Sequence, residues 1–330
     1  MKVIVVHDPL FTEEDSWESH FSSILHGYVE SSGRTDCTVE TCNDVSLMKT
    51  YFQNGYITKN DKIVFPNAWI SCIPYIKHWA EIYKINVEMI GFWSRGCFIN
   101  TDPIYRPYRD RNWRKVRERG NFRCLHKSFF ISEYFKEQFR IYVSKKVFPE
   151  RLHVIPFPLD YVNLELSKYS DGFIKQDVIV FPWFKYDGFQ EQIIYDFIRV
   201  FPKTQVIFAQ EHFPMERSQI LTQIARSKVV MLPYDSPNLG QEIYECILLG
   251  AIPVVPDFGN FKEMLPKEFV YDLEWTRSII SYCKYANQLT DFVNNLVVNY
   301  DQYVPLIEEY KSYMYECFFD SEKVIREIFQ

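Results

Sequence analysis

The stretch "LPYDSPNLGQEIYECILLGAIPVVPDFGNFKEML", residues 232–265, decides the fold assignment. It continues an apolar run, "KVVML" (228–232), through a polar loop into a helical pattern, "GQEIYECILL" (240–249). The run "IPVVP" (252–256) that follows has the β-branched residues of a buried strand. Strand, loop, helix and strand in this order form the repeating unit of a parallel sheet.

The start of this helix has features that suit an anionic ligand. Gly240 lets the backbone turn tightly and lets a ligand approach it closely. The free N–H groups and the positive end of the helix dipole favour negative charge at that point. Glu242 and Glu245 lie three residues apart and share a helix face, and Glu245 sits one turn in, where its carboxylate can accept two hydroxyls of a ribose. The alternative is ordinary capping by an acidic first turn, which many α/β proteins show.

The rest of the chain alternates strand and helix patterns. Apolar runs predict strands, and apolar residues at helical spacing predict helices between them. The predicted strands are 2–6, 37–41, 61–67, 86–93, 127–132 and 151–158 in the first half, and 177–184, 205–210, 228–234 and 252–256 in the second. The predicted helices include 16–30, 73–84, 133–143 and 189–201, and the chain is expected to be helical from about 285 to its end.

This order predicts an α/β protein with two Rossmann-like, doubly wound domains that face a cleft. A length of 330 residues suits two domains of about 150 residues each. We expect an N-terminal domain over 1–156, to which a C-terminal helix at about 312–330 returns, and a second domain over 157–311. Ligands bind beyond the carboxyl ends of the strands in such sheets, so the cleft is the expected site.

The distribution of charge and of cysteines indicates which ligands and which cellular compartment to expect. The net charge is −6, yet residues 106–127 hold seven Arg, two Lys and two acids, a local balance of +7. The eight cysteines form no zinc-like spacing, and those in apolar runs, such as Cys246 and Cys283, are expected to be reduced core residues of a cytoplasmic protein. No apolar run is long enough for a signal peptide or for a membrane span.

Residues 232–265 resemble the C-terminal signature of the large family of retaining nucleotide-sugar glycosyltransferases with the two-Rossmann, or GT-B, fold. Weaker similarity, in the right order, covers about two thirds of the chain. It includes "VIVFPWFKYDGFQEQIIYDF" (178–197), "LHKSFFISEYFKEQF" (125–139) and "VIPFPLDY" (154–161). The matching positions of the signature are Pro233, Leu239 (at the family's Phe), Gly240, Glu245, Gly250 and the run "IPVV" (252–255).

The resemblance implies a nucleotide diphospho-sugar, with UDP-sugar expected, as co-substrate, and no other cofactor. It makes residues 1–156 the acceptor-binding domain and 157–311 the donor-binding domain. The first glutamate of the family's pair falls on Pro237, and the donor loop offers only Lys185 where the family has an Arg and a Lys. The expected donor-binding residues are Arg95, Lys185, Asn238, Leu239, Gly240, Gln241, Glu242 and Glu245.

The resemblance also implies a retaining reaction, in which the donor phosphate takes the acceptor proton and no enzymic nucleophile is needed. No Asp-x-Asp motif is evident, so we expect a metal-independent transferase with no bound metal. If a general base exists, Asp102 is the candidate, although an Asx-Pro turn is the more common role for an aspartate in this context.

The basic run at residues 105–127 predicts that the acceptor is a polyanion. Arginines alternate with aromatic residues in "YRPYRDRNWRKVRERGNFRCLHK" (105–127), as phosphate and stacked bases require. A solvated amphipathic helix is the equally frequent alternative. The expected polyanion-binding residues are Arg106, Arg109, Arg111, Trp113 and Arg114.

In size and in its Tyr/Phe/Ile/Lys-rich composition the chain resembles bacteriophage transferases that glycosylate hydroxymethylated cytosine in DNA, which would place it in the host cytoplasm. Duplex DNA is therefore the expected partner, with base flipping to present the hydroxymethyl group. The alternatives are a transferase acting on a polysaccharide or lipid-linked glycan and a nucleotide-binding relative that has lost activity. The sequence leaves open which sugar is moved and the oligomeric state.

Overall fold

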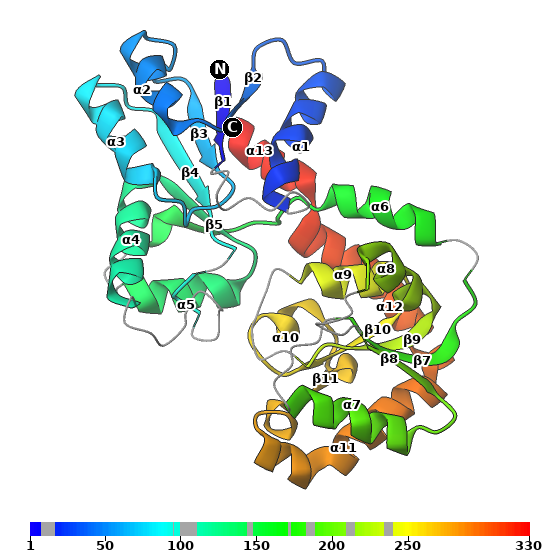
Figure 1. The fold of residues 1–330 in the computed structure, drawn as a ribbon. Helices are drawn as coiled ribbons and strands as arrows, with labels where there is room; N and C mark the ends of the chain where they lie inside the picture. The colour runs from blue at the N-terminus through cyan, green and yellow to red at the C-terminus, as the bar shows by residue number, and fades with distance from the viewer. Residues whose placement is uncertain are drawn as a thin grey trace. The chain divides into compact units, whose positions relative to one another are not determined.

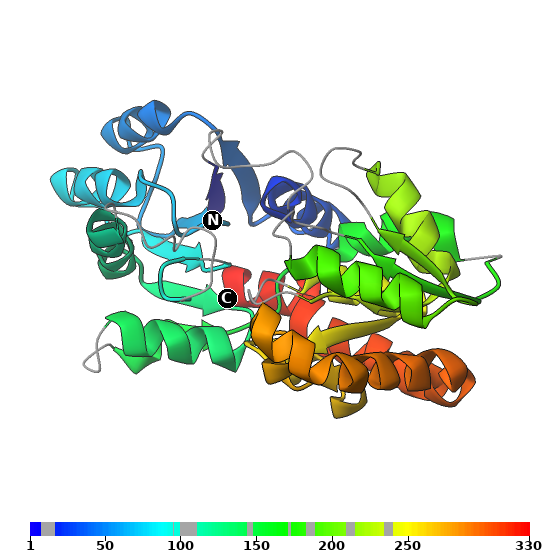
Figure 2. The ribbon, with the colours of Figure 1, turned by 60° about the horizontal axis from the view of Figure 1, so that its bottom comes forward.

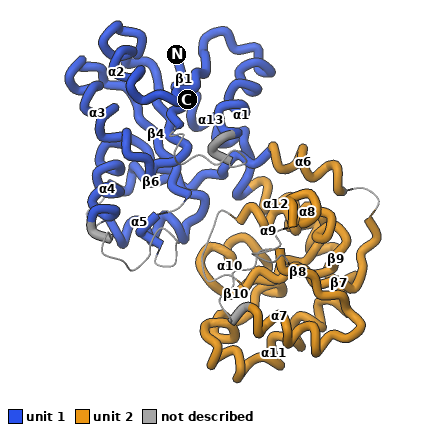
Figure 3. The backbone as a smooth tube through the Cα atoms, in the orientation of Figure 1, with its two compact units in different colours: residues 1–160, 317–330 blue, residues 161–316 orange. Residues whose placement is uncertain are grey.

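The chain forms two compact units, each with its own parallel sheet (Figure 3). The structure is a computed structural model that describes residues 1–7, 17–94, 96–99, 111–143, 148–170, 173–182, 189–208, 215–233 and 240–330. At 17–19, 111, 112, 170, 189 and 190 it describes the backbone alone. Unit 1 comprises residues 1–160 and 317–330, and unit 2 comprises residues 161–316.

Unit 1 is built on a six-stranded sheet in the order β2-β1-β3-β4-β5-β6, in which every pairing is parallel (Figure 1). The strand formed by residues 2–6, which lies inside the sheet, shows why such residues form strands: Val3, Ile4, Val5 and Val6 are β-branched and fully buried on both faces. The strands are β1 (Lys2–Val6), β2 (Thr38–Cys42), β3 (Lys62–Phe65), β4 (Glu88–Phe92), β5 (Lys127–Phe130) and β6 (Leu152–Val154).

Helices cover this sheet through apolar stripes at helical spacing, such as Ile73, Ile76 and Ala80 in α3. Helices α2, α3 and α4 lie one beside the next, and α13 lies beside α1 (Figure 2). The helices are α1 (Trp17–Ser31), α2 (Val45–Gln53), α3 (Ile73–Ile82), α4 (Arg111–Cys124), α5 (Glu133–Val143) and α13 (Ser321–Phe329), with a 3-10 turn η2 (Pro149–Arg151).

Unit 2 has a five-stranded parallel sheet in the order β11-β10-β9-β7-β8 (Figure 1). Its strands are β7 (Gln176–Phe181), β8 (Gln205–Phe208), β9 (Ser227–Met231), β10 (Ile252–Pro256) and β11 (Val270–Tyr271). Its helices are α6 (Asp160–Ser170), α7 (Phe189–Val200), α8 (Arg217–Arg226), α9 (Gln241–Leu248), α10 (Phe261–Met264), α11 (Ile279–Val298) and α12 (Tyr300–Met314), with 3-10 turns η3 (Lys267–Phe269) and η4 (Leu273–Trp275). The π-helical segment η5 (Tyr315–Phe319) carries the chain from unit 2 back to unit 1.

The prediction of two α/β units with parallel sheets flanked by helices is confirmed. The elements that were not predicted include α2, α6, α8, α10 and β11. Two of them, α6 and α8, position side chains of the candidate site. The division of the chain into a donor and an acceptor domain stays a prediction.

The C-terminal segment belongs to unit 1. The backbone N–H of Phe157 donates to the carbonyl of Phe318 at 2.7 Å, and Lys127 forms an ion pair with Glu327 of α13 at 3.1 Å. Glu88 contacts Lys127 at 3.5 Å and Lys62 at 3.0 Å, which continues this charge network across three strands. Helix α13 is thus tied to unit 1 by polar contacts as well as by its buried face.

All eight cysteines are free thiols. Cys246 is buried in α9, as predicted, but the core position predicted for Cys283 is wrong because its side chain is exposed. It follows the buried Tyr282 in α11, and one residue turns a helix by about 100°, away from the buried stripe. Within the described ranges, none of the helices combines the length and the apolar character required to cross a bilayer.

Candidate functional site

The helix that opened the sequence analysis, α9, begins at the carboxyl edge of the unit 2 sheet. Strand β9 ends at Met231, α9 starts at Gln241, and β10 returns beside β9 in parallel. The carboxyl edge of a parallel sheet is where ligands bind in folds of this type. The first turn of α9 therefore lies where a ligand site is expected.

Gly240 is the residue before α9 and has the left-handed backbone conformation, with φ 78° and ψ 15°. A Cβ built there would lie 2.5 Å from the Met264 sulfur, closer than real side chains approach. Met264 is fully buried, so the methionine side chain fills the space beside the glycine. The backbone angle favours a glycine at the start of the helix, and the end of the Met264 side chain would have to shift to admit any other residue.

Glu245 lies one turn into α9 and is only 3 % exposed. Its Oε1 accepts a hydrogen bond from Arg217 Nη2 at 2.7 Å and another from Gln241 Nε2 at 2.8 Å. Among the described residues, no hydrogen bond reaches Oε2. Burial raises the pKa of Glu245, and the charge of Arg217 opposes that rise.

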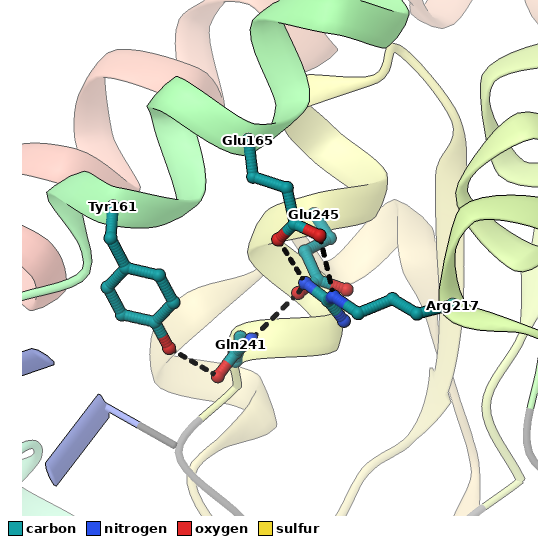
Figure 4. Close-up of polar contacts among 5 residues, drawn as sticks. All are labelled: Tyr161, Glu165, Arg217, Gln241 and Glu245. Atoms are coloured by element: carbon teal, nitrogen blue, oxygen red, sulfur yellow. Dashed lines mark hydrogen bonds and ion pairs between the residues drawn. The ribbon is translucent and has the colours of Figure 1, made fainter. Parts of the chain in front are cut away.

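Arg217, the first residue of α8, bridges two carboxylates (Figure 4). Its Nε and Nη2 donate to the two oxygens of Glu165 at 2.9 and 2.7 Å, and Nη2 also donates to Glu245. Burial disfavours the guanidinium charge, but hydrogen bonds to Glu165 and the charge of Glu245 outweigh it and raise the pKa of Arg217. The two-pronged contact fixes the plane of the guanidinium group.

Helix α6 provides the outer contacts of this cluster. The Tyr161 hydroxyl donates to Gln241 Oε1 at 3.2 Å, and Gln241 in turn donates to Glu245. The Tyr244 hydroxyl donates to Asn163 Oδ1 at 3.0 Å. Figure 4 shows Tyr161 and Glu165 reaching the cluster from α6, so both partners of Glu245 are themselves held by that helix.

The structure brings together four of the predicted donor residues, Gly240, Gln241, Glu242 and Glu245, at the start of α9. Glu242 is partly exposed, whereas Glu245 is buried. The other predicted donor or catalytic residues lie outside the described residues: Arg95, Asp102, Lys185, Asn238 and Leu239.

Tyr161, Glu165 and Arg217 were not predicted from the sequence as site residues. One local signal marks the start of α8: Glu216 and Gln219 form a reciprocal capping box around Arg217. That pattern predicts a helix but says nothing of what its first residue contacts. The pairing with α9 became visible only in the folded chain.

In unit 1 the basic run forms helix α4, with one polar face buried and one exposed. Its one acid, Glu118, is fully buried and accepts hydrogen bonds from Trp69 Nε1 at 2.8 Å and the backbone N–H of Cys97 at 2.6 Å. Asn121 donates to the carbonyls of Ala68 and Ile70 at 2.9 and 2.8 Å. These contacts tie α4 to the segments that follow β3 and β4 at the carboxyl edge of the unit 1 sheet.

The outer side of α4 is basic and aromatic. Trp113 is 47 % exposed and Val116 is 71 % exposed, and the guanidinium carbon of Arg117 lies 4.6 Å from the Trp69 ring centre and 5.6 Å from that of Trp113. Since the only acid of the helix points inward, its outer side carries positive charge. Of the predicted polyanion-binding residues, Trp113 and Arg114 lie on this helix, Arg111 is its first residue with no side chain described, and Arg106 and Arg109 lie outside the described residues.

No family model and no curated protein matches the sequence. Solved structures do match over the whole chain. HepE from Anabaena in complex with UDP-glucose has a TM-score of 0.62 at 11 % identity, over 100 % of this chain and 99 % of that chain. Sucrose-phosphate synthase from Thermosynechococcus elongatus gives 0.63 at 8 % identity, over 99 % of each chain. The OtsA apo structure gives 0.63 at 9 % identity, over 100 % of this chain and 99 % of that chain.

At these identities the likeness establishes the fold and nothing more. It extends over both units, so the chain has the two-Rossmann GT-B architecture that the sequence predicted.

Proposed function

We propose that this protein is a glycosyltransferase that moves a sugar from a nucleotide diphospho-sugar, with a UDP-sugar as donor, to a hydroxyl acceptor. The observation that carries the proposal is the start of α9, where a left-handed glycine precedes a helix with a buried glutamate one turn in. This start lies at the carboxyl edge of a parallel sheet, in a chain whose fold matches a structure that holds UDP-glucose.

The first turn of α9 suits the two halves of a nucleotide diphosphate. The N–H groups and dipole at a helix start stabilise negative charge, so they suit the diphosphate as the glycosidic bond breaks. The Glu245 carboxylate suits the ribose because its oxygens accept hydrogen bonds from hydroxyls. Gly240 keeps side-chain atoms away from the backbone at this point.

We propose a retaining, metal-independent transfer. The bond between the sugar C1 and the diphosphate oxygen breaks, the bond from C1 to the acceptor oxygen forms on the same face, and the acceptor proton passes to the departing diphosphate. The helix start and nearby cations supply the charge stabilisation in this scheme. Turnover that survives chelation with EDTA, with the product's anomeric configuration measured by NMR, checks both parts of the proposal.

For the acceptor we propose hydroxymethylated cytosine in duplex DNA. The supporting observation is the outer side of α4, where the partly exposed Arg114 and the exposed Arg119 accompany the exposed ring of Trp113. Guanidinium groups suit phosphates and an exposed indole suits a stacked base. The cytoplasmic location and the phage-like role stay predictions.

A lipid-linked or polysaccharide acceptor is the second candidate. The exposed Val116, one turn from Trp113, gives α4 an apolar strip with basic residues beside it, as interfacial helices have. A third outcome, a nucleotide-binding relative without activity, is consistent with Pro237 in place of the family's first glutamate.

The deciding experiment is incubation with radiolabelled UDP-sugars and hydroxymethylated duplex DNA, plain duplex DNA, a lipid-linked glycan, or no acceptor. Label in the hydroxymethylated DNA alone supports the DNA proposal, and label in the glycan supports the second candidate. Slow hydrolysis without transfer indicates an enzyme with another acceptor. Failure to bind or turn over any nucleotide sugar contradicts the proposed function.

The role of α4 has its own matched control. Arg114→Gln/Arg119→Gln/Arg123→Gln removes three positive charges from α4, and Arg199→Gln/Arg277→Gln/Arg326→Gln removes three exposed charges elsewhere. DNA binding should fall only in the first variant, and the salt dependence of its affinity should become shallower. Equal losses in both variants would exclude α4 as the binding surface.

A further inference from the structure

The cluster around Glu245 contains more than a ribose-binding carboxylate requires. A buried acid that binds two hydroxyls needs only its own oxygens, but here three helices contribute to holding it: α8 through Arg217, α6 through Glu165 and Tyr161, and α9 through Gln241. Both direct contacts reach the same oxygen, Oε1, at 2.7 and 2.8 Å. The carboxylate is thereby fixed from one side.

We propose that Arg217 is a positioning residue for donor binding: anchored by Glu165, it holds the Glu245 carboxylate in the orientation that receives the ribose hydroxyls through Oε2. This inference rests on the proposed function and adds residues from α6 and α8 to it. Arg217 acts through Glu245 and not by touching the donor.

The geometry supports this role in two ways. The contact between Arg217 and Glu165 is bidentate, at 2.9 and 2.7 Å, and such a pair restricts the rotation of the guanidinium group. The same Nη2 that completes this pair also donates to Glu245, so any rotation of Glu245 away from its position breaks a bond to an anchored donor. Gln241 limits the remaining freedom because Tyr161 holds its amide.

Charge supports the same role. The charged groups that face Glu245 are Arg217 from α8 and Glu165 from α6, and the neighbouring Cys246 thiol stays protonated because burial raises its pKa. Burial raises the pKa of Glu245, and Arg217 counteracts the rise. Without Arg217 the carboxyl group would take up a proton at higher pH and accept fewer hydrogen bonds from hydroxyls.

The test is UDP-glucose binding by calorimetry to the full chain and to Arg217→Gln, with Arg226→Gln as the matched control. Arg226 is the last residue of the same helix and is exposed, so the control removes the same charge about 13 Å along the helix. We expect Arg217→Gln to bind about tenfold more weakly at neutral pH, and Arg226→Gln to bind as the unchanged protein does.

Two further readouts separate positioning from a merely structural role. The pH below which affinity is lost should move upward in Arg217→Gln, because the pKa of Glu245 rises when the Arg217 charge is removed. Each phosphate of the donor has one ester and one anhydride bond and keeps a single charge across this range, so the donor itself does not titrate. Arg217→Lys, which keeps the charge but not the fork, should restore the pH profile more fully than the affinity. On a Glu245→Ala background, Arg217→Gln should cause no additional loss.

The outcomes distinguish this inference from the proposed function. If the unchanged protein binds UDP-glucose but Arg217→Gln binds equally well, the positioning role is wrong and the donor site stands. If the full tenfold loss persists on the Glu245→Ala background, Arg217 touches the donor directly and the inference is wrong. If the unchanged protein binds no nucleotide sugar, both proposals fall. Should Arg217→Gln not fold, as circular dichroism would show, Glu165→Gln keeps the arginine but loosens its anchor, and UDP-glucose binding at neutral pH should weaken by less than tenfold. Unchanged affinity in Glu165→Gln would then overturn the positioning role.

Discussion

At the scale of single residues, burial decides which polar groups act as fixed partners. Glu245 and Glu242 have the same chemistry and lie in one helix, yet Glu245 is buried beside the Arg217 guanidinium group, whereas Glu242 is partly exposed. A carboxylate removed from water needs such partners, because an unpaired buried charge costs several kcal/mol. The neighbouring Gly240 is constrained in the same way by its backbone angle and by Met264.

Replacing Gly240 with alanine should destabilise unit 2 by about 2 kcal/mol, because alanine is strained in the left-handed conformation and its methyl group meets Met264. Urea unfolding followed by circular dichroism measures the change. Gly27→Ala is the matched control: Gly27 lies inside α1 with open space around it, so the same substitution there should stabilise the chain by about 0.5–1 kcal/mol. An unchanged unfolding midpoint in Gly240→Ala would contradict the constraint.

The buried Lys175 should make the free energy of unfolding depend on pH. Its ammonium group donates to the carbonyls of Ser227 and Ile224 at 2.8 and 3.3 Å, and burial lowers its pKa to about 7. In the unfolded chain the pKa is about 10.4, so between these values the unfolded state binds more protons and stability rises with pH. The rise is at most about 1.4 kcal/mol per pH unit and stops below the folded pKa.

The comparison of Lys175→Met with the unchanged protein isolates this effect. Urea midpoints between about pH 7 and pH 9 should rise less steeply in Lys175→Met, whereas exposed Lys262→Met should keep the original slope. Parallel slopes in all three proteins would mean that Lys175 stays charged in the folded chain.

At the scale of elements, several helices pack against their unit with one face and present polar or basic side chains with another. Helix α4 buries Glu118 and Asn121 against the segments after β3 and β4 and exposes Arg119 and Arg123. Helices α6 and α8 likewise bury apolar residues in unit 2 and direct polar side chains to the cluster around Glu245 and to α9. Each helix start or segment proposed to bind a ligand is therefore held by a neighbouring helix.

Asn121→Ala should destabilise unit 1 by about 2–3 kcal/mol, because the carbonyls of Ala68 and Ile70 lose a buried donor and a cavity forms. Hydrogen exchange of peptides that contain residues 66–70 should become faster than in the unchanged protein. The exposed Asn60→Ala is the control and should change neither quantity. Equal exchange in the two variants would show that α4 does not hold this segment.

At the scale of the whole molecule, the chain leaves unit 1 after Asp160, builds unit 2 and returns at Cys317. The returning helix α13 buries Val324, Ile325, Ile328 and Phe329 in unit 1. The ring of Phe329 lies 5.8 Å from that of Tyr28 in α1, so the two ends of the chain stabilise the same unit.

Deleting residues 321–330 should destabilise unit 1 by on the order of 5 kcal/mol, since four apolar side chains lose their burial. Hydrogen exchange should accelerate in β1 and α1 and stay unchanged in β10 of unit 2. Glu327→Gln, which removes only the partly exposed ion pair with Lys127, should cost about 1 kcal/mol or less. Equally faster hydrogen exchange in both units would contradict the prediction that α13 stabilises unit 1 and not unit 2.

Local patterns in the sequence were sufficient for the architecture and for part of the site. The β-branched runs predicted ten of the strands, the glycine at 240 predicted the helix start, and the spacing from Gly240 placed Glu245 one turn in. These features depend on residues within a few positions of one another, so they can be recognised without a fold.

The contacts that Arg217, Glu165 and Tyr161 make in this cluster were decided by the tertiary structure alone. Arg217 lies 28 residues from Glu245 and 52 from Glu165, and Tyr161 lies 80 residues from Gln241. No periodic pattern connects these positions, and an arginine or a glutamate at a helix end is ordinary on any solvated surface. Only the packing of α6 and α8 against α9 removes these side chains from water, and it is this loss of water that makes their charges depend on one another.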